Sequence, residues 1–353
     1  MTLPSVARKV GELVFVGGTG PSADAPAAAP PGDVRGQAHA AFDALAELLE
    51  TAGGDLGDVI DLVSLHADAR TIEMVFEVGR ERFGGDFPAW TPVAVTALPV
   101  PGALVTLSAV AHLGDAPKRC VVPDTIMWWH DLPASAGCRK GDLLFVAGMY
   151  GSDADGNVNT PGDHAGQARN ALNRVKEICE LSGASLGDVV AVTSFHQDPR
   201  WIPSVAAVYE EEFFGAGGGG RAWSAVGVPG LLRLGMLGQY RAVVDAGSDA
   251  TLAAGTGAPP AGEDGDVVHR GDPEAQARAA FEALEQSLAG AGMSLADVVQ
   301  LASFHIDAEA FEAAARVGRE LFGGGDAPAW TAAGMTGTWE EGQQHALHAL
   351  AAR

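Results

Sequence analysis

The chain repeats one sequence unit three times, and this repetition constrains its fold more than any other feature. Residues 36–68, 166–198 and 275–307 align without a gap, and each segment ends in a variant of one motif: VSLHAD, TSFHQD or ASFHID. A chain of 353 residues is too long for one compact core, and a repeat of this length indicates several copies of one structural unit. We predict three repeats, at 1–118, 119–247 and 248–353, joined by short links.

Each repeat has the periodicity of alternating strands and helices. Apolar residues at three- and four-residue spacing over 38–52 predict an amphipathic helix, and the β-branched run DVIDLVSL at 58–65 predicts a strand. The segments ELVFVGG (12–18) and DLLFVAG (142–148) predict earlier strands. A second helix, a Phe-Gly stop and a closing strand follow. We therefore predict a β-β-α-β-α-β unit of the α+β class, which the third repeat abbreviates at its start.

Charge and hydropathy exclude two classes of partner. The chain has 45 acidic and 22 basic residues, a formal charge of -23, which repels phosphate backbones and anionic membrane surfaces. No apolar run approaches the ~20 residues of a membrane span, and the first residues lack the features of a signal peptide. We expect a cytoplasmic protein without nucleic-acid or membrane partners.

Three cysteines, Cys120, Cys138 and Cys179, form an odd set without CxxC spacing. Such a set is not typical of a disulfide framework or of a cysteine-based zinc site. We expect reduced thiols with a structural role, no metal and no cofactor.

The order of motifs resembles the RidA (YjgF-like) family. A strand ending in Gly-Gly or Ala-Gly is followed by GQA, then GD with paired valines, then PAW or RAW before the closing strands. The resemblance implies a chorismate-mutase-like fold and trimers with a ligand cleft at each subunit interface. Three fused copies would form a single-chain pseudo-trimer around a central barrel, a monomer in solution whose three clefts need not be identical.

The chemistry of the deaminating family members does not transfer to this chain residue by residue. Those members hydrolyse enamines and imines with an Arg that clamps the substrate carboxylate and a Glu on the last strand. The corresponding positions hold Trp90, Trp223 and Trp330 in place of the Arg, and Thr106, Gln239 and Ala346 in place of the Glu. An indole cannot form the bidentate contact of a guanidinium, so we expect no deamination of simple amino-acid-derived imines.

The recurring motif places Ser, His and Asp on one face of a strand and apolar residues on the other. Because the helices need the apolar face, we expect His66, His196 and His305 to point into the interior, where the three sheets would meet. Ser and His two residues apart on a strand are about 6 to 7 Å apart at the backbone, which argues against a hydrolase triad within one repeat.

Three interpretations of these histidines remain open. They hydrogen-bond to nearby Ser and carbonyl groups as buried structural residues. Alternatively, each is an acid or base in a cleft, because imidazole titrates near neutrality. Finally, the three rings together bind one zinc ion, which requires their nitrogens ~2.0–2.1 Å from a common point.

The clefts that involve repeats two and three have most of the candidate ligand-binding side chains. Trp90, Trp223 and Trp330 either plug their clefts or form aromatic walls for an apolar or cationic ligand. Repeat two adds polar groups, and repeat three adds two histidines on its last strand. These candidates are Tyr150, Arg221, Gln239, Arg241, His345 and His348.

Two functions from different classes follow. The first is an enzyme of specialised metabolism, of deaminase/hydrolase or lyase/cyclase type, acting on a small apolar or aromatic enamine, imine or enol. Histidine would then move protons and Trp would hold the substrate. The alternative is a catalytically silent protein that binds a small molecule, which loss of both the Arg and the Glu favours.

Overall fold

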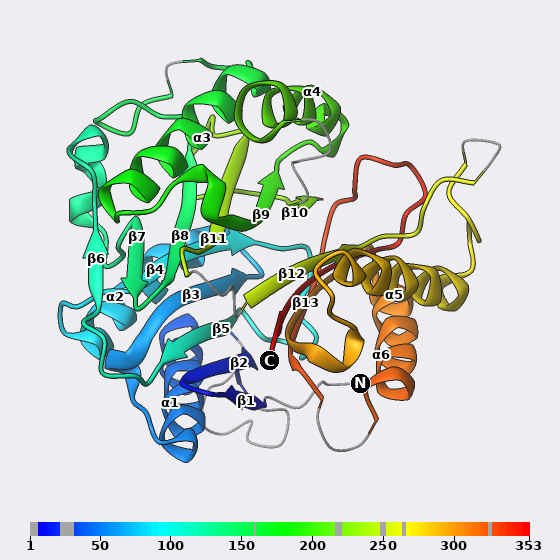
Figure 1. Ribbon diagram of the computed structural model, residues 1–353, viewed down its shortest axis with the longest axis horizontal. Coiled ribbons are helices and arrows are strands. Elements are labelled where there is room, and N and C mark those ends of the chain that lie inside the picture. The colour runs from blue at the N-terminus through cyan, green and yellow to red at the C-terminus, as the bar shows by residue number, and fades with distance from the viewer. Residues whose placement is uncertain are drawn as a thin grey trace.

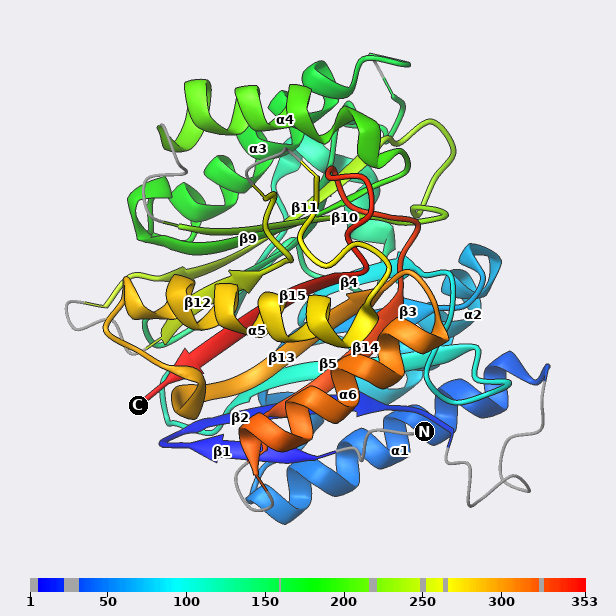
Figure 2. The ribbon, with the colours of Figure 1, turned by 90° about the vertical axis from the view of Figure 1, so that its right-hand side faces the viewer.

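The protein contains three mixed β-sheets, one per repeat, in a computed structural model that describes residues 6–21, 32–158, 160–215, 221–247, 252–262, 266–323 and 327–353. The helices lie on the outside and the strands gather in the middle (Figure 1). In the view turned by 90°, α5 and α6 cover the near side of the third sheet (Figure 2). Within the described residues, no helix is long and apolar enough to span a membrane.

The first sheet has the strand order β1-β2-β5-β3-β4. Its strands are β1 Ala7–Val10, β2 Leu13–Thr19, β3 Val59–His66, β4 Ala89–Ala94 and β5 Val105–His112. Its helices are α1 Val34–Ala52 and α2 Ile72–Phe83.

The second sheet has the order β10-β9-β11-β8-β7-β6. Its strands are β6 Arg119–Val121, β7 Gly137–Lys140, β8 Leu143–Tyr150, β9 Val189–His196, β10 Ala222–Gly227 and β11 Gly238–Asp245. Its helices are α3 His164–Leu181 and α4 Ile202–Val208, which continues into a π-helical turn at Tyr209–Phe214.

The third sheet has four described strands in the order β12-β15-β13-β14. They are β12 Leu252–Gly257, β13 Val298–His305, β14 Ala329–Gly334 and β15 His345–Ala352. Its helices are α5 Pro273–Ala289 and α6 Ala308–Phe322. Within the described residues this sheet has no counterpart of β1 or β7, as the abbreviated start of the repeat predicted.

The α+β class and the predicted helix over 38–52 are confirmed, but each unit ends in two strands where we predicted one, and repeat two also begins with a further short strand, β6. After α2 the chain forms β4, which pairs parallel with β3, and then β5, which pairs antiparallel with both β2 and β3. The unit is therefore β-β-α-β-α-β-β in repeat one. The predicted pattern merged these two segments into one closing strand.

The recurring Gly-Asp motif, which reads Ala-Asp in repeat three, forms a cap before strands β3, β9 and β13. In repeat one, Gly57 N donates to Asp55 Oδ1 at 2.7 Å, and Asp55 N donates to Asp58 Oδ2 at 3.1 Å. The same capping box occurs at Ser185 and Asp188 and again in repeat three. Capping satisfies backbone N–H groups of a short 3-10 turn and fixes the direction in which the strand begins.

The recurring Gln of GQA and AQA clamps the loop that precedes the last strand. Gln37, buried near the start of α1, donates through Nε2 to Gly102 O at 3.0 Å and accepts from Leu104 N at 2.7 Å. Gln167 and Gln276 make the same pair of contacts in their repeats. A buried amide satisfied at both ends holds helix and loop in one register.

Backbone bridges link the three repeats in cyclic order. They join matched positions at the ends of the edge strands β4, β10 and β14. The bridges connect Ala94 to Gly230, Gly227 to Gly337, and Gly334 to Ala97. Repeat one thus contacts repeat two, repeat two contacts repeat three, and repeat three returns to repeat one.

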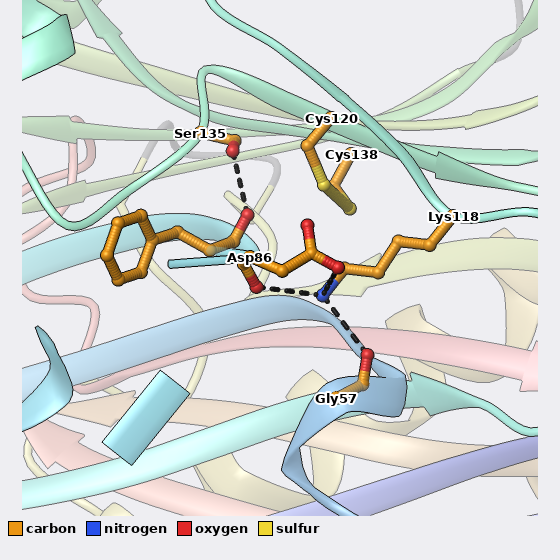
Figure 3. Close-up of a disulfide and its surroundings, with 7 residues drawn as sticks. Gly57, Asp86, Lys118, Cys120, Ser135 and Cys138 are labelled. Atoms are coloured by element: carbon orange, nitrogen blue, oxygen red, sulfur yellow. Dashed lines mark hydrogen bonds and ion pairs between the residues drawn. A yellow bond between two sulfur atoms is a disulfide. The ribbon is translucent and has the colours of Figure 1, made fainter. Parts of the chain in front are cut away.

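Cys120 and Cys138 form a disulfide, so the expectation of reduced thiols is wrong for this pair (Figure 3). Antiparallel pairing of β6 with β7 places the two residues opposite each other. Sequence spacing did not reveal this proximity, because it depends on strand register. Nearby, Lys118 Nζ donates to Gly57 O at 3.2 Å and to Asp86 O at 3.1 Å, which ties this segment to repeat one.

Candidate functional site

The recurring histidines lie on the helix-facing side of their sheets, so the predicted orientation toward the interior is wrong. One cavity is lined by residues of all three sheets, among them Val63, Thr193 and Ala302, and we call it the three-sheet cavity. The apolar face of β3 therefore points inward, while His66 Nδ1 lies 2.9 Å from Thr71 Oγ1 next to α2. The sheet is buried on both faces, so apolar character did not identify the face that contacts the helices.

In repeat one, His66 is part of a fully hydrogen-bonded chain. Trp90 Nε1 donates to Ser64 Oγ at 2.9 Å, and Ser64 Oγ lies 2.8 Å from His66 Nε2. Since the Thr71 hydroxyl donates to Asp68 O at 2.7 Å, we assign a proton on His66 Nδ1 and a lone pair on Nε2. Burial lowers the pKa of His66 to about 3, so the ring is neutral at neutral pH.

Repeats two and three have the same Trp-Ser-His contact, but the second ring nitrogen of the histidine, Nδ1, has a different environment in each. Trp223 Nε1 and Trp330 Nε1 donate to the Ser of their own repeats at 2.9 and 2.8 Å. His305 Nδ1 continues to His345 Nδ1 at 3.0 Å, and His345 Nε2 donates to Pro273 O at 2.8 Å. His196 Nδ1 has no hydrogen-bond partner among the described residues. Burial lowers the pKa of His196 to about 3 and holds that of His305 well below its usual range.

These contacts agree best with the structural interpretation of the three histidines. Within the described part of the chain, no three His, Cys, Asp or Glu residues are grouped so that they could hold a metal ion. The Asp of each motif is equally structural, since Asp68, Asp198 and Asp307 cap the helical turn that follows. The catalytic role of His66, His196 and His305 stays a prediction.

Two of the three recurring indoles lie in helix-sheet cores. Trp90 is fully buried and packs edge-to-face against Phe76, with ring centroids 4.8 Å apart. A Cβ at Gly79 would lie 2.4 Å from the Trp90 ring, and the same distance separates a Cβ at Gly318 from Trp330. A glycine on the second helix therefore makes room for the indole in repeats one and three.

Repeat two has Tyr209 where the other repeats have this glycine. Its ring stacks on Trp223 with centroids 4.5 Å apart and planes at 13°. The helix changes to π-helical geometry at Tyr209, and Trp223 remains partly exposed. Trp223 reaches a cleft between repeats, and its role as an aromatic wall for a ligand stays a prediction.

This cleft, which we call the Trp223 cleft, lies between β10 of repeat two and β12 and β15 of repeat three. Its volume is about 150 Å³. Trp223 and Trp339 form two of its walls, with ring centroids 5.9 Å apart and planes at 89°. Ser224, Thr256, Thr338 and Gln343 add hydroxyl and amide groups.

Two polar side chains of the cleft, Thr338 and Gln343, are held by neighbouring atoms. The Thr338 hydroxyl lies 2.5 Å from Gln343 Oε1, and Gln343 Nε2 donates to Pro259 O at 2.7 Å. None of the described lining residues carries a titratable side chain. The cleft thus offers aromatic faces and fixed dipoles rather than an acid or a base.

The polar candidates of repeat two do not gather in one cleft. Gln239 Nε2 lies 2.6 Å from Tyr150 Oη, and both side chains are buried. Arg221 donates to the carbonyls of Leu186 and Gly187 at 3.1 Å. Arg241 lines the three-sheet cavity instead, where its Nη2 lies 2.6 Å from Asp61 Oδ2.

Comparison with known proteins agrees with the repeat structure. The family model described as Endoribonuclease L-PSP matches residues 4–113, 133–237 and 232–339. The chain belongs to this family. It carries three tandem RidA-like units in one polypeptide.

Curated RidA-like relatives align with one unit at a time. The RutC family protein YjgH of Escherichia coli is 37% identical over 97 residues, which are 28% of this chain and 72% of the relative. The RutC family protein PH0854 of Pyrococcus horikoshii is 35% identical over 81 residues, 23% of this chain and 64% of the relative.

Solved structures also match single units. Rv2704 of Mycobacterium tuberculosis is 26% identical, with 36% of this chain and 99% of that chain covered and a TM-score of 0.31. The YjgF gene product of E. coli is 27% identical, with 36% and 98% covered and a TM-score of 0.32.

Ala346 makes room in the Trp223 cleft. It stands where the RidA resemblance places the catalytic Glu, and its methyl group lines the cavity. The matched Gln239 of repeat two is fully buried, and a Cβ at Gly148 would lie 2.2 Å from its Nε2. In repeat two, the long side chain of Gln239 thus fills the space that corresponds to the one Ala346 leaves open in repeat three.

Sequence reasoning missed Trp339, Gln343 and Tyr209 as contributors to this site. The available signal was divergence among the repeats: Trp339 aligns with Pro99 and Leu232, and Tyr209 aligns with glycines. Departures from the repeat consensus pointed to the cleft better than the recurring residues did.

Proposed function

We propose that this protein binds a small apolar or aromatic molecule in the Trp223 cleft and does not transform it there. The observation that carries this proposal is the lining: two indoles with a few hydroxyl and amide groups, without a titratable side chain among the described lining residues. Aromatic walls with few polar groups are typical of small-molecule sites. General acid-base chemistry needs a titratable group within hydrogen-bond reach of the reacting atom.

The volume of the cleft supports a ligand built around one ring. A cavity of about 150 Å³ in another protein accepts benzene, so a ligand with a single six-membered ring and short substituents matches this space. Edge and face contacts with Trp223 and Trp339 favour an aromatic over an aliphatic ring of equal size. The hydroxyls of Ser224 and Thr256 are suited to one polar substituent.

The enzyme hypothesis has less support at this cleft. His66, His196 and His305 do not line it, and each ring is already engaged by a Ser of its own motif. Cleavage of RNA, which the family description names, is not favoured, because the formal charge is -23 and no Lys or Arg is among the described lining residues. An enzyme of this cleft would need a substrate that supplies its own acid or base.

The test uses indole, benzyl alcohol and cyclohexanol as probes and saturation-transfer NMR as the readout. We expect the two aromatic probes to bind more tightly than cyclohexanol. Ala346→Gln copies the residue of repeat two at the matched position, and we expect it to abolish binding by filling the cleft. Ala289→Gln, on an exposed end of α5, is the matched control and should bind as the wild type does.

Two outcomes would contradict the proposal. Binding that survives Ala346→Gln would place the ligand elsewhere. Consumption of a bound probe, abolished in His196→Ala while binding persists, would favour the enzyme hypothesis instead.

We also propose that the three units form a single-chain pseudo-trimer around a central barrel, and that the chain is a monomer. The cyclic bridges at Ala94, Gly227 and Gly334 support this, as does a cavity lined from all three sheets. Three fused units already contain the contacts that single-unit relatives would obtain by association. Light scattering should give 36.1 kDa, and a stable trimer of full-length chains would contradict the proposal.

A further inference from the structure

The three-sheet cavity contains polar groups that the proposed function does not use. Its volume is about 40 Å³. Leu65, Phe195 and Phe304 form an apolar wall, and Arg241 and His348 lie among the polar residues. Val63, Arg241, Gln300 and Ala302 keep partial exposure, so the cavity has access to solvent.

Several buried polar atoms of this cavity have no hydrogen-bond partner among the described residues. They are Arg241 Nε, Asp61 Oδ1, Thr331 Oγ1 and both ring nitrogens of His348. Buried polar groups in native proteins are nearly always paired, so atoms of this kind gathered around one cavity indicate a site that a polar molecule completes.

The cyclic order of the repeats explains why His348 lacks a partner. Arg241 of repeat two pairs with Asp61 of repeat one, and Gln300 of repeat three donates to Ser108 of repeat one at 3.2 Å. Asp61 and Gln300 are matched positions, and so are Ser108, Arg241 and His348. The remaining pair in this cyclic order joins repeat three to repeat two. In it the partner position of His348 is Ala191, whose methyl group cannot hydrogen-bond.

The charge of the site restricts what it can bind. Burial raises the pKa of Asp61 and Arg241 counteracts this; because a guanidinium stays charged, we assign an ion pair. Burial lowers the pKa of His348 to about 3, so that ring is neutral. The side chains therefore sum to zero charge, and adding a charged ligand to this buried site would carry an uncompensated desolvation cost.

The free atoms include both donors and acceptors. Arg241 Nε donates, Asp61 Oδ1 accepts, neutral His348 does one of each, and the Thr331 hydroxyl does either. A primary amide has the complementary set, since its carbonyl accepts and its NH₂ group donates twice. Its alkyl part would face Phe195 and Phe304. The volume allows about three water-sized molecules, or a ligand of about four non-hydrogen atoms.

We propose that the three-sheet cavity is a second binding site, distinct from the Trp223 cleft, for a small neutral amide or urea-type group. Arg241 and Thr331 donate to its carbonyl oxygen, and Asp61 and His348 accept from its nitrogen. A ligand of this size binds weakly, with a Kd on the order of millimolar.

Acetamide, acetate and acetamidinium test this proposal, because they share one shape and differ in charge. Saturation transfer to their methyl groups reports binding to the whole protein. We expect acetamide to bind at least tenfold more tightly than either ion. Ala191→Gln, which supplies the missing partner of His348 and fills the space, should abolish acetamide binding, whereas the exposed control Ala289→Gln should not change it.

Thr331→Val provides a second variant that conserves side-chain volume. It removes one donor, and we expect acetamide to bind several-fold more weakly. Three results would overturn the proposal: acetate or acetamidinium binding as tightly as acetamide, no acetamide binding by the wild type, which would mean that the cavity holds water only, or binding unchanged in both Ala191→Gln and Thr331→Val. None of these results depends on ligands of the Trp223 cleft.

Discussion

Replacing the Ser of one Trp-Ser-His contact should destabilise the fold strongly. Ser64 is fully buried, accepts from Trp90 Nε1 and bonds to His66 Nε2, and both partners are fully buried as well. Ser64→Ala leaves two buried polar groups unsatisfied, at about 1–3 kcal/mol each. We therefore expect the free energy of unfolding to fall by about 2–6 kcal/mol, measured by urea titration.

Two other serines, Ser194 and Ser204, allow this prediction to be compared with smaller expected losses of stability. Trp223 is partly exposed, so Ser194→Ala leaves one fully buried orphan, His196 Nε2, and should cost about 1–3 kcal/mol. Ser204, whose hydroxyl bonds to Trp201 O on the surface, is the control, and Ser204→Ala should stay within about 0.5 kcal/mol. The reasoning fails if Ser64→Ala costs less than about 1 kcal/mol, or no more than Ser204→Ala.

Three further predictions concern pH, thiols and catalysis. The unfolded chain protonates its histidines near pH 6.5, while the buried rings of His66, His196 and His348 stay neutral to about pH 3. The free energy of unfolding should therefore be flat between about pH 7 and 8 and fall below pH 6.5 by about 1.4 kcal/mol per pH unit for each ring. Urea midpoints that do not change between pH 4 and 6 would contradict this. Iodoacetamide should not label the native protein without a reductant, because Cys120 and Cys138 are joined and burial raises the pKa of Cys179 to about 12; mass spectrometry would detect an adduct. In a coupled assay with a threonine dehydratase, the protein should not accelerate keto-acid release, and a rate like that of an Arg-containing relative would refute this.

The repeat pattern predicted the fold well because it depends on local periodicity. Helix α1 lies where the apolar spacing of 38–52 placed it, and β3 lies within one residue of the predicted run. The face of β3 was assigned wrongly, because the strand is buried on both sides and alternation alone does not say which side the helices cover. The domain limits at 1–118, 119–247 and 248–353 stay predictions.

The candidate site was predicted only in part, for a similar reason. Trp223 was singled out and lines the cleft, but Trp90 and Trp330 carry the same motif and lie in helix-sheet cores. What separates them is Tyr209, which stacks on Trp223 from a neighbouring helix. Contacts of this kind join residues distant in sequence, and so does the pairing of Cys120 with Cys138. Single-sequence patterns do not reveal them.

The pairing of Arg241 with Asp61 shows what fusion of the repeats permits. In a ring of three identical chains, one inward-facing Arg would appear three times, and three like charges would repel each other across a narrow space. Here the three matched positions hold Ser108, Arg241 and His348, and their partner positions hold Gln300, Asp61 and Ala191. One polypeptide can thus change the chemistry of a shared centre one residue at a time, which separate identical subunits cannot do.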